Sequence, residues 1–176
     1  MFIPAILVTI VTFPGIIVHE LAHQLFCRWF KIPVFEVCYF RIGNPAGYVI
    51  HEVPQKYHQS LFISIGPFII NTLLAFIIGF PAALQFKFDS ASFSDYFLVY
   101  LAVSIGAHAF PSVGDAGSLW KSVMNAENKN WFIKLITVPA VGVIYLGAIG
   151  SFFWLDIIYG MGVGVGLPYA LIEMLV

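Results

Sequence analysis

Two histidines and a glutamate stand close together in an apolar segment near the start of the chain. The stretch Gly15–Phe26 reads GIIVHELAHQLF and holds His19, Glu20 and His23 in the pattern H-E-x-x-H. At 3.6 residues per helical turn, His19 and His23 lie on one face, one turn apart, so both imidazoles can reach one metal ion. Glu20 lies beside them, where its carboxylate can take a proton from a water molecule on that ion. The pattern therefore predicts a zinc site with hydrolytic chemistry.

The composition places this motif in a membrane. Of the 176 residues, 60% are hydrophobic and only 10% are charged, whereas soluble domains carry about 25% charged residues. A soluble fold of this size could not bury so much apolar surface, and two cysteines give no disulfide framework. A net charge of −1 offers no electrostatic basis for nucleic-acid binding. We expect an integral membrane protein that interacts with the lipid bilayer and has no nucleic-acid partner.

The membrane setting sharpens the meaning of the motif. Ionisable side chains in a lipid-buried helix are costly and usually functional. The alternatives to a metal site are a polar contact between helices and a proton path.

The apolar stretches predict an all-α polytopic protein with about five transmembrane helices of about 20 residues each. The expected crossings are residues 2–26, 61–86, 95–113 and two within 131–176. The first stretch lacks a basic start and a small-residue cleavage site, so we expect an anchor and not a cleaved signal peptide. No repeat or separate soluble domain is visible. We expect one membrane-embedded domain over residues 1–176, with a catalytic core at about 1–120 and accessory helices at about 131–176.

The basic residues predict the orientation in the cell membrane. Seven of the eight lysines and arginines fall between crossings one and two or around the start of crossing four, and only Lys87 falls on the other side. Lys and Arg favour the cytosolic side, so the N-terminus is expected outside and the H-E-x-x-H motif near the cytosolic face. Asp89, Asp95 and Asp156 are then expected on or near the outer side, which makes them poor metal ligands.

The segment between the first two crossings predicts a small β-hairpin on the cytosolic side. Residues 34–40 and 47–53 are rich in β-branched and aromatic residues, and the turn formers Gly43, Asn44 and Pro45 lie between them. Two roles are open for this hairpin. It can cap the helix ends, or its edge strand can pair with an extended peptide.

A catalytic zinc ion keeps three protein ligands, so one is still required. Cys27 lies eight residues from His19, about 12 Å along a regular helix, which is too far for both to join His23 on one ion. Asp115 is the preferred third ligand, since Pro111 breaks the helix just before it and irregular backbone at membrane depth is tolerated where it lines a cavity. Asp115 can also serve as a helix N-cap. Weaker alternatives on the same side are Glu36, Glu52, Glu127, His51 and His58.

His108 lies seven residues before Asp115 in an apolar stretch. We predict a catalytic role in which its ring donates a hydrogen bond to a developing oxyanion. An extra metal ligand and a buried structural histidine are the alternatives.

Other polar and small residues predict packing within the membrane. Pro14-Gly15 and Gly66-Pro67 are expected to disturb their helices, and Asn71 to hydrogen-bond a neighbouring helix. Glycines at 160, 162, 164 and 166 give small-xxx-small spacing, which favours close packing of the last helix, including in a homodimer.

These motifs together resemble the site-2 protease family of intramembrane zinc metalloproteases. The resemblance covers residues 1–120 and rests on the H-E-x-x-H helix, the G-P…N element of the next crossing and the Asp after the third. It implies Zn²⁺ on His19, His23 and Asp115, with Glu20 as general base and acid. It also implies cleavage of a transmembrane protein substrate near the cytosolic face, in regulated intramembrane proteolysis, with the hairpin guiding the peptide.

Two departures indicate a divergent branch of that family. His108 stands where the family's third motif carries an asparagine, and Gly66-Pro67 is one residue further from Asn71 than in the family pattern. A non-proteolytic zinc-binding protein, either a transporter or a scaffold, is the alternative function. A transporter would need a polar path across the whole bilayer, and the outer halves of the crossings offer little beyond Asp95 and Asp156.

Overall fold

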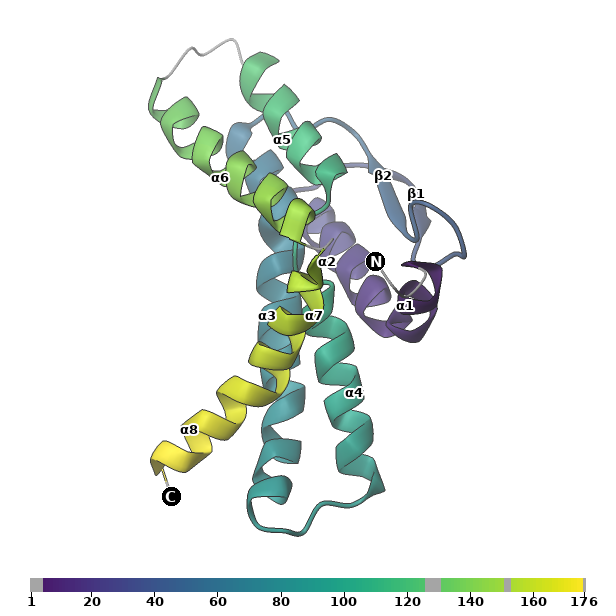
Figure 1. Ribbon diagram of the computed structural model, residues 1–176. Coiled ribbons are helices and arrows are strands. Elements are labelled where there is room, and N and C mark those ends of the chain that lie inside the picture. Colours follow the sequence, from purple (N-terminus) through teal and green to yellow (C-terminus); the bar gives the residue numbers. More distant parts are fainter. Residues whose placement is uncertain (1–4, 126–130, 151–152, 176) are drawn as a thin grey trace.

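The computed structural model describes residues 5–125, 131–150 and 153–175, and is mostly helical with one small two-stranded sheet (Figure 1). This confirms the helical fold class and the presence of a hairpin between the first two long helices. In chain order the elements are α1 (Ala5–Val11), α2 (Phe13–Trp29), β1 (Val34–Cys38), β2 (Tyr48–His51), α3 (Tyr57–Lys87), α4 (Phe93–Ala107), α5 (Val113–Asn125), α6 (Trp131–Gly150), α7 (Leu155–Met161), the π-helical turn η2 (Gly162–Gly166) and α8 (Leu167–Leu175).

The first apolar stretch is interrupted, as the Pro14-Gly15 pair predicts. Helix α1 ends at Val11 and α2 begins at Phe13, with Thr12 between them. Proline is tolerated in the first turn of a helix because its missing N–H would have no partner there. The break starts a new helix just before the H-E-x-x-H motif, which lies wholly within α2.

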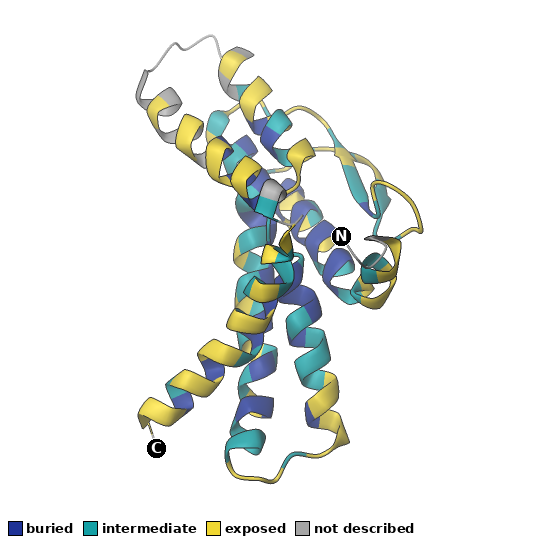
Figure 2. Ribbon diagram, in the orientation of Figure 1, coloured by how far each residue is buried: buried dark blue, intermediate teal, exposed yellow. Residues whose placement is uncertain are grey.

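Helix α3 is the central element, and α2, α4, α5, η2 and α8 all pack against it. Helix α5 packs near the N-terminal end of α3, and α4 and α8 pack against its C-terminal half (Figure 1). The buried residues concentrate where α2, α3 and α4 meet (Figure 2). This junction is the structural core that positions the motif.

Two helical segments among the described residues are long and apolar enough to cross a membrane. They are α3, with 31 residues, and the continuous segment Leu155–Leu175 formed by α7, η2 and α8. Helix α4 is apolar but shorter, with 15 residues. Large hydrophobic side chains such as Leu73, Ile77 and Met174 point outward from these helices, as expected for surfaces in contact with lipid.

The glycine-rich last segment packs against its own chain. A Cβ atom added at Gly160 would lie 2.6 Å from the backbone nitrogen of Ala107, and one added at Gly79 would lie 1.7 Å from the carbonyl oxygen of Gly164. The small residues therefore allow α7 and η2 to approach α4 and α3 at backbone distance. The close packing predicted from the spacing is confirmed within the chain, and the homodimer stays a prediction.

The hairpin is antiparallel, with Val37 opposite Val49 and Cys38 opposite Tyr48, and the register shifts between Val34 and Glu36. Its strands are shorter than the predicted stretches 34–40 and 47–53, since residues 39–47 form the connecting loop. Both strands contact α2. The hairpin thereby lies beside the helix that carries the motif.

Candidate metal centre

The two histidines of the motif meet as helical spacing predicts. His19 and His23 lie one turn apart on α2, and both are buried, with 9% and 6% of their surface exposed. Their Nε2 atoms are 3.2 Å apart. Tetrahedral zinc with Zn–N bonds of about 2.0–2.1 Å places two nitrogen ligands about 3.3 Å apart, so this spacing suits two ligands of one ion.

Asp115 completes the group from the first turn of α5. Its Oδ1 lies 3.2 Å from Nε2 of His23 and its Oδ2 lies 4.0 Å from Nε2 of His19. One ligand atom from each of the three residues lies within 4.8 Å of the others. Among the described residues this is the group of His, Cys, Asp and Glu side chains that could hold a metal ion.

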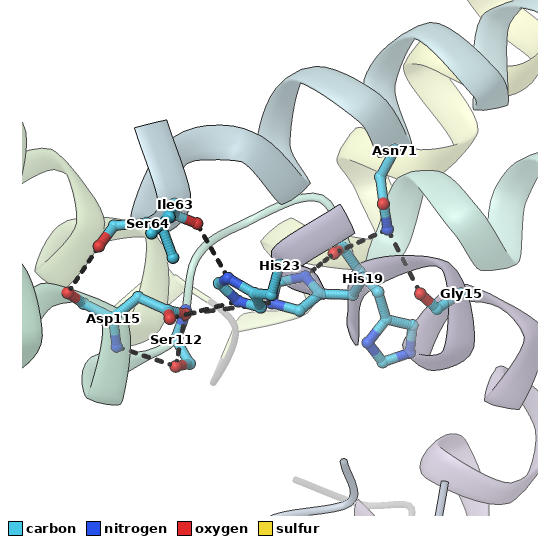
Figure 3. A network of polar contacts seen from close by, with 9 residues as sticks. Gly15, His19, His23, Ile63, Ser64, Asn71, Ser112 and Asp115 are labelled. Atoms are coloured by element: carbon cyan, nitrogen blue, oxygen red, sulfur yellow. Dashed lines mark hydrogen bonds and ion pairs between the residues drawn. The ribbon is translucent and has the colours of Figure 1, made fainter. Parts of the chain in front are cut away.

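Backbone carbonyls fix how both imidazoles point (Figure 3). The Nδ1 of His19 donates to the carbonyl oxygen of His108 at 2.7 Å, and the Nδ1 of His23 donates to that of Ile63 at 2.9 Å. A carbonyl oxygen can only accept a hydrogen bond, so each Nδ1 carries the ring hydrogen. In a neutral ring, Nε2 is then the nitrogen with the free lone pair, and in both histidines this atom faces Asp115. Two imidazole acceptors and a carboxylate then converge, and this arrangement could hold a metal ion. A backbone carbonyl that accepts the Nδ1 hydrogen is typical of metal-binding histidines.

Asp115 is also held by the end of its own helix. Its Oδ2 accepts hydrogen bonds from the backbone N–H and the hydroxyl of Ser112, both at 2.7 Å, and its own N–H donates to the Ser112 hydroxyl at 3.2 Å. This reciprocal arrangement is a capping box at the start of α5. The cap and ligand roles that the sequence left open are therefore compatible in one side chain.

The charge state of Asp115 follows from these neighbours. Burial raises the pKa of this carboxyl, but the neighbouring His23 and His19 and the Ser112 hydroxyl lower it more, so its pKa lies well below the usual range. The carboxylate form, which is the form that binds a metal, is favoured.

The group opens into a cavity of about 810 Å³. Glu20 lines it next to His19 and His23, and it is buried, with 8% of its surface exposed. The hairpin contributes residues 44–49 and His51, and the segment 107–115 forms another wall. A cavity of this size holds a short peptide segment or a small ligand.

His108 lies beside the metal group but its ring points elsewhere. Helix α4 ends at Ala107, and the ring Nε2 of His108 lies 2.7 Å from the hydroxyl of Thr12. The backbone carbonyl of His108, and not its ring, contacts His19. The position of His108 in the sequence gave no sign of this backbone contact, since the contact requires α4 to end several residues before the predicted limit at 113.

Within the part of the chain that the structure describes, neither Cys27 nor the weaker ligand alternatives belong to the metal group. Cys27 is fully buried in an apolar cluster with Phe26 and Ile63. Glu36 accepts a hydrogen bond from Tyr48, and the ring of His58 packs against Phe30. His51 lines the cavity with its Nδ1 at 2.8 Å from the carbonyl of Glu52. Glu127 lies outside the described residues.

Asp156 differs from its expected place. It lies at the start of α7 and lines the same cavity as the metal group, although the sequence predicted it near the opposite end of the crossings. The chain turns at Trp154, whose φ of 64° is left-handed, and α7 then packs against α4. The turn before α7 therefore lies next to the C-terminal end of α4, where the cavity is.

The predicted hydrogen bonding of Asn71 to a neighbouring helix is confirmed, and it involves two helices. Its Nδ2 donates to the carbonyls of Gly15, Ile105 and His108 at 3.1 to 3.3 Å, and so joins α3 to α2 and to the end of α4 (Figure 3). The His108 carbonyl thus receives hydrogen bonds from both Asn71 and His19.

Comparisons with known proteins provide no relative for this chain. No family model, no curated protein and no solved structure matches it.

Proposed function

We propose that this protein is an intramembrane zinc metalloprotease that hydrolyses peptide bonds of membrane-spanning substrates near the cytosolic face. The observation that carries the proposal is the convergence of His19, His23 and Asp115 beside Glu20 in one cavity. The resemblance of these motifs to the site-2 protease family supports the same function. The donor set alone also suits other divalent metals, so zinc belongs to the proposal.

His19, His23 and Asp115 would hold the ion, and all three are oriented by hydrogen bonds that leave their ligand atoms facing one another. A zinc ion bound there supplies a Lewis acid that acidifies water and polarises an amide carbonyl. Glu20 accepts a proton from the attacking water while the water oxygen bonds to the carbonyl carbon of the peptide. Glu20 then gives that proton to the amide nitrogen as the C–N bond breaks, which returns the carboxylate to its starting state.

The proposed oxyanion role of His108 requires its ring to change partner. The Thr12 hydroxyl donates to the carbonyl of Val8, so Nε2 of His108 carries the hydrogen of the neutral ring and donates it to Thr12. To donate a hydrogen bond to an oxyanion, the neutral ring would have to release Thr12. The contact that the structure offers without any rearrangement is between its carbonyl and His19. A role in orienting His19 therefore has the more direct support.

The proposed topology has about five crossings, with the N-terminus outside and the active site toward the cytosol of a multi-pass cell-membrane protein. The two spanning candidates and the placement of seven of eight basic residues support it. Tyr48 and Val49 of β2 line the cavity, which supports a hairpin that guides an extended stretch of a transmembrane protein substrate toward Glu20.

The test is hydrolysis by the purified protein in detergent or proteoliposomes, using a membrane-spanning reporter. Glu20→Gln should abolish cleavage while zinc binding stays, because the substitution removes the proton acceptor and leaves the ligands. Glu52→Gln, the same change at an exposed residue just after β2, should cleave as the wild type does. Equal activity of the wild type and Glu20→Gln would remove the protease proposal. Zinc uptake into proteoliposomes without cleavage would favour the transporter, and zinc binding with neither would favour the scaffold.

A further inference from the structure

Helix α3 contains two prolines, Pro67 and Pro81, and is nevertheless a continuous helix of 31 residues. A proline has no backbone N–H, so the carbonyl four residues earlier loses its helical hydrogen bond, and the proline ring pushes that carbonyl aside. The carbonyl that Pro67 leaves free belongs to Ile63. The one that Pro81 leaves free belongs to Ile77.

The Ile63 carbonyl has a specific partner from another helix. It accepts the hydrogen bond of His23 Nδ1 at 2.9 Å, in a buried contact between residues 40 positions apart. This bond sets the tautomer of His23 and directs its Nε2 toward Asp115, 3.2 Å away. The acceptor that orients one proposed metal ligand is thus the carbonyl that a proline removes from the helical ladder.

The neighbouring glycine permits the contact. A Cβ atom added at Gly66 would lie 2.2 Å from Cδ2 of Phe26 on α2. The Phe26 ring of α2 therefore packs directly on the backbone of α3 at this turn, one helical turn from His23, whose ring reaches the free carbonyl. Pro67 itself is fully buried.

We propose that Pro67 is a positioning residue for the metal centre: by withholding an N–H from the Ile63 carbonyl, it reserves that carbonyl for His23. This inference rests on the proposed metal-binding function. An ordinary residue at position 67 supplies the N–H, which draws the Ile63 carbonyl back toward the helix axis and away from the imidazole. His23 then loses its orienting partner while the ligand side chains themselves are unchanged.

The competing explanation is that Pro67 only fills space. Two substitutions separate these roles, because both restore the N–H but differ in volume: Pro67→Ala leaves a small void, and Pro67→Val nearly keeps the proline volume. Pro81→Ala is the matched control, since it makes the same change in the same helix at an exposed position.

The experiment compares full-length wild-type protein and these three variants in detergent. Zinc affinity is measured by competition with a chelator, the visible spectrum is recorded after loading with Co²⁺, and thermal unfolding of the metal-free proteins reports folding. We expect both Pro67 variants to lose about 10- to 100-fold in zinc affinity, the loss typical of outer partners of metal ligands, and to show an altered cobalt spectrum. The Pro81→Ala protein should match the wild type in both.

Unchanged affinity and spectrum in Pro67→Ala would overturn the inference and leave the metal site standing. Loss in Pro67→Ala that Pro67→Val restores would also overturn it, in favour of packing. A wild type that binds neither zinc nor cobalt would overturn the proposed function first, and the inference with it.

Discussion

Gly47 of the hairpin packs directly against the side chain of Glu20. A Cβ atom added at position 47 would lie 2.7 Å from Cγ of Glu20 and 3.0 Å from its Oε1. The loop before β2 can therefore cover the proposed general base only because residue 47 has no side chain. This contact links the hairpin to the chemistry of the site.

Replacing Gly47 with alanine is expected to disturb Glu20 and to leave the proposed metal ligands in place. The added methyl group must push either the loop or the carboxylate aside, and a displacement of about 1 Å in an active site can cost about 100-fold in rate. We expect a 10- to 100-fold loss of cleavage with unchanged zinc content, measured on the same preparation. Gly43→Ala is the control, because a Cβ atom there meets only the Arg41 side chain, at 3.9 Å. Equal rates for the two variants would show that the contact does not constrain Glu20.

Removing the hydroxyl of Ser112 should weaken both α5 and the metal centre. The hydroxyl caps the helix and holds Oδ2 of Asp115, so Ser112→Ala should cost about 1 kcal/mol of stability and about 10-fold or more in zinc affinity. The measurements are thermal unfolding and chelator competition.

The matched control for this prediction lies at the start of α4. Ser92 and Asp95 form the same capping box far from the metal group, with a hydroxyl-to-carboxylate distance of 2.6 Å. Ser92→Ala should lower stability by a similar amount without affecting zinc. A similar zinc affinity in both serine variants would contradict a supporting role for Ser112.

Gly15 should tolerate no side chain, because α2 and α4 touch there. A Cβ atom would lie 2.0 Å from the carbonyl oxygen of Ser104 and 2.7 Å from the His108 ring. We expect Gly15→Ala to lower the free energy of unfolding by about 1–3 kcal/mol through overpacking, seen as a lower midpoint of thermal unfolding. Gly142→Ala in α6 meets no atom within 4 Å and should be neutral or slightly stabilising. A wild-type midpoint for Gly15→Ala would contradict the close approach.

Local rules predicted the parts of the site that depend on helical spacing and helix breakers. The placement of His19 and His23 follows from one turn of helix, and the approach of Asp115 follows from the break at Pro111, which starts a new helix close to the motif. The hairpin followed from its turn residues and β-branched flanks. These signals lie within a few residues of the features that they determine.

The contacts that orient the ligands could not be predicted, because they depend on how helices are aligned with one another. Ile63 is an apolar residue, and its carbonyl can accept the His23 hydrogen bond only because α2 lies beside it. The one sign of this contact in the sequence was Pro67, four residues later, which leaves that carbonyl without a helical partner. The position of Asp156 beside the metal group could not be predicted, because the sequence of residues 131–176 fits two crossings without showing where the chain turns. Gly47 gave no signal of its contact with Glu20, since a glycine after Asn44-Pro45 is already expected in a turn.

If α2 and α5 hold one metal ion jointly, elemental analysis of the purified protein will find that ion. We predict about one zinc per chain in the wild type and in His58→Ala, whose ring lies against Phe30 and outside the ligand group. His23→Ala and Asp115→Ala should both lose the metal while remaining folded by thermal unfolding. Zinc retained at the wild-type level in Asp115→Ala, or no metal in the wild type, would show that α2 and α5 do not bind a metal ion together.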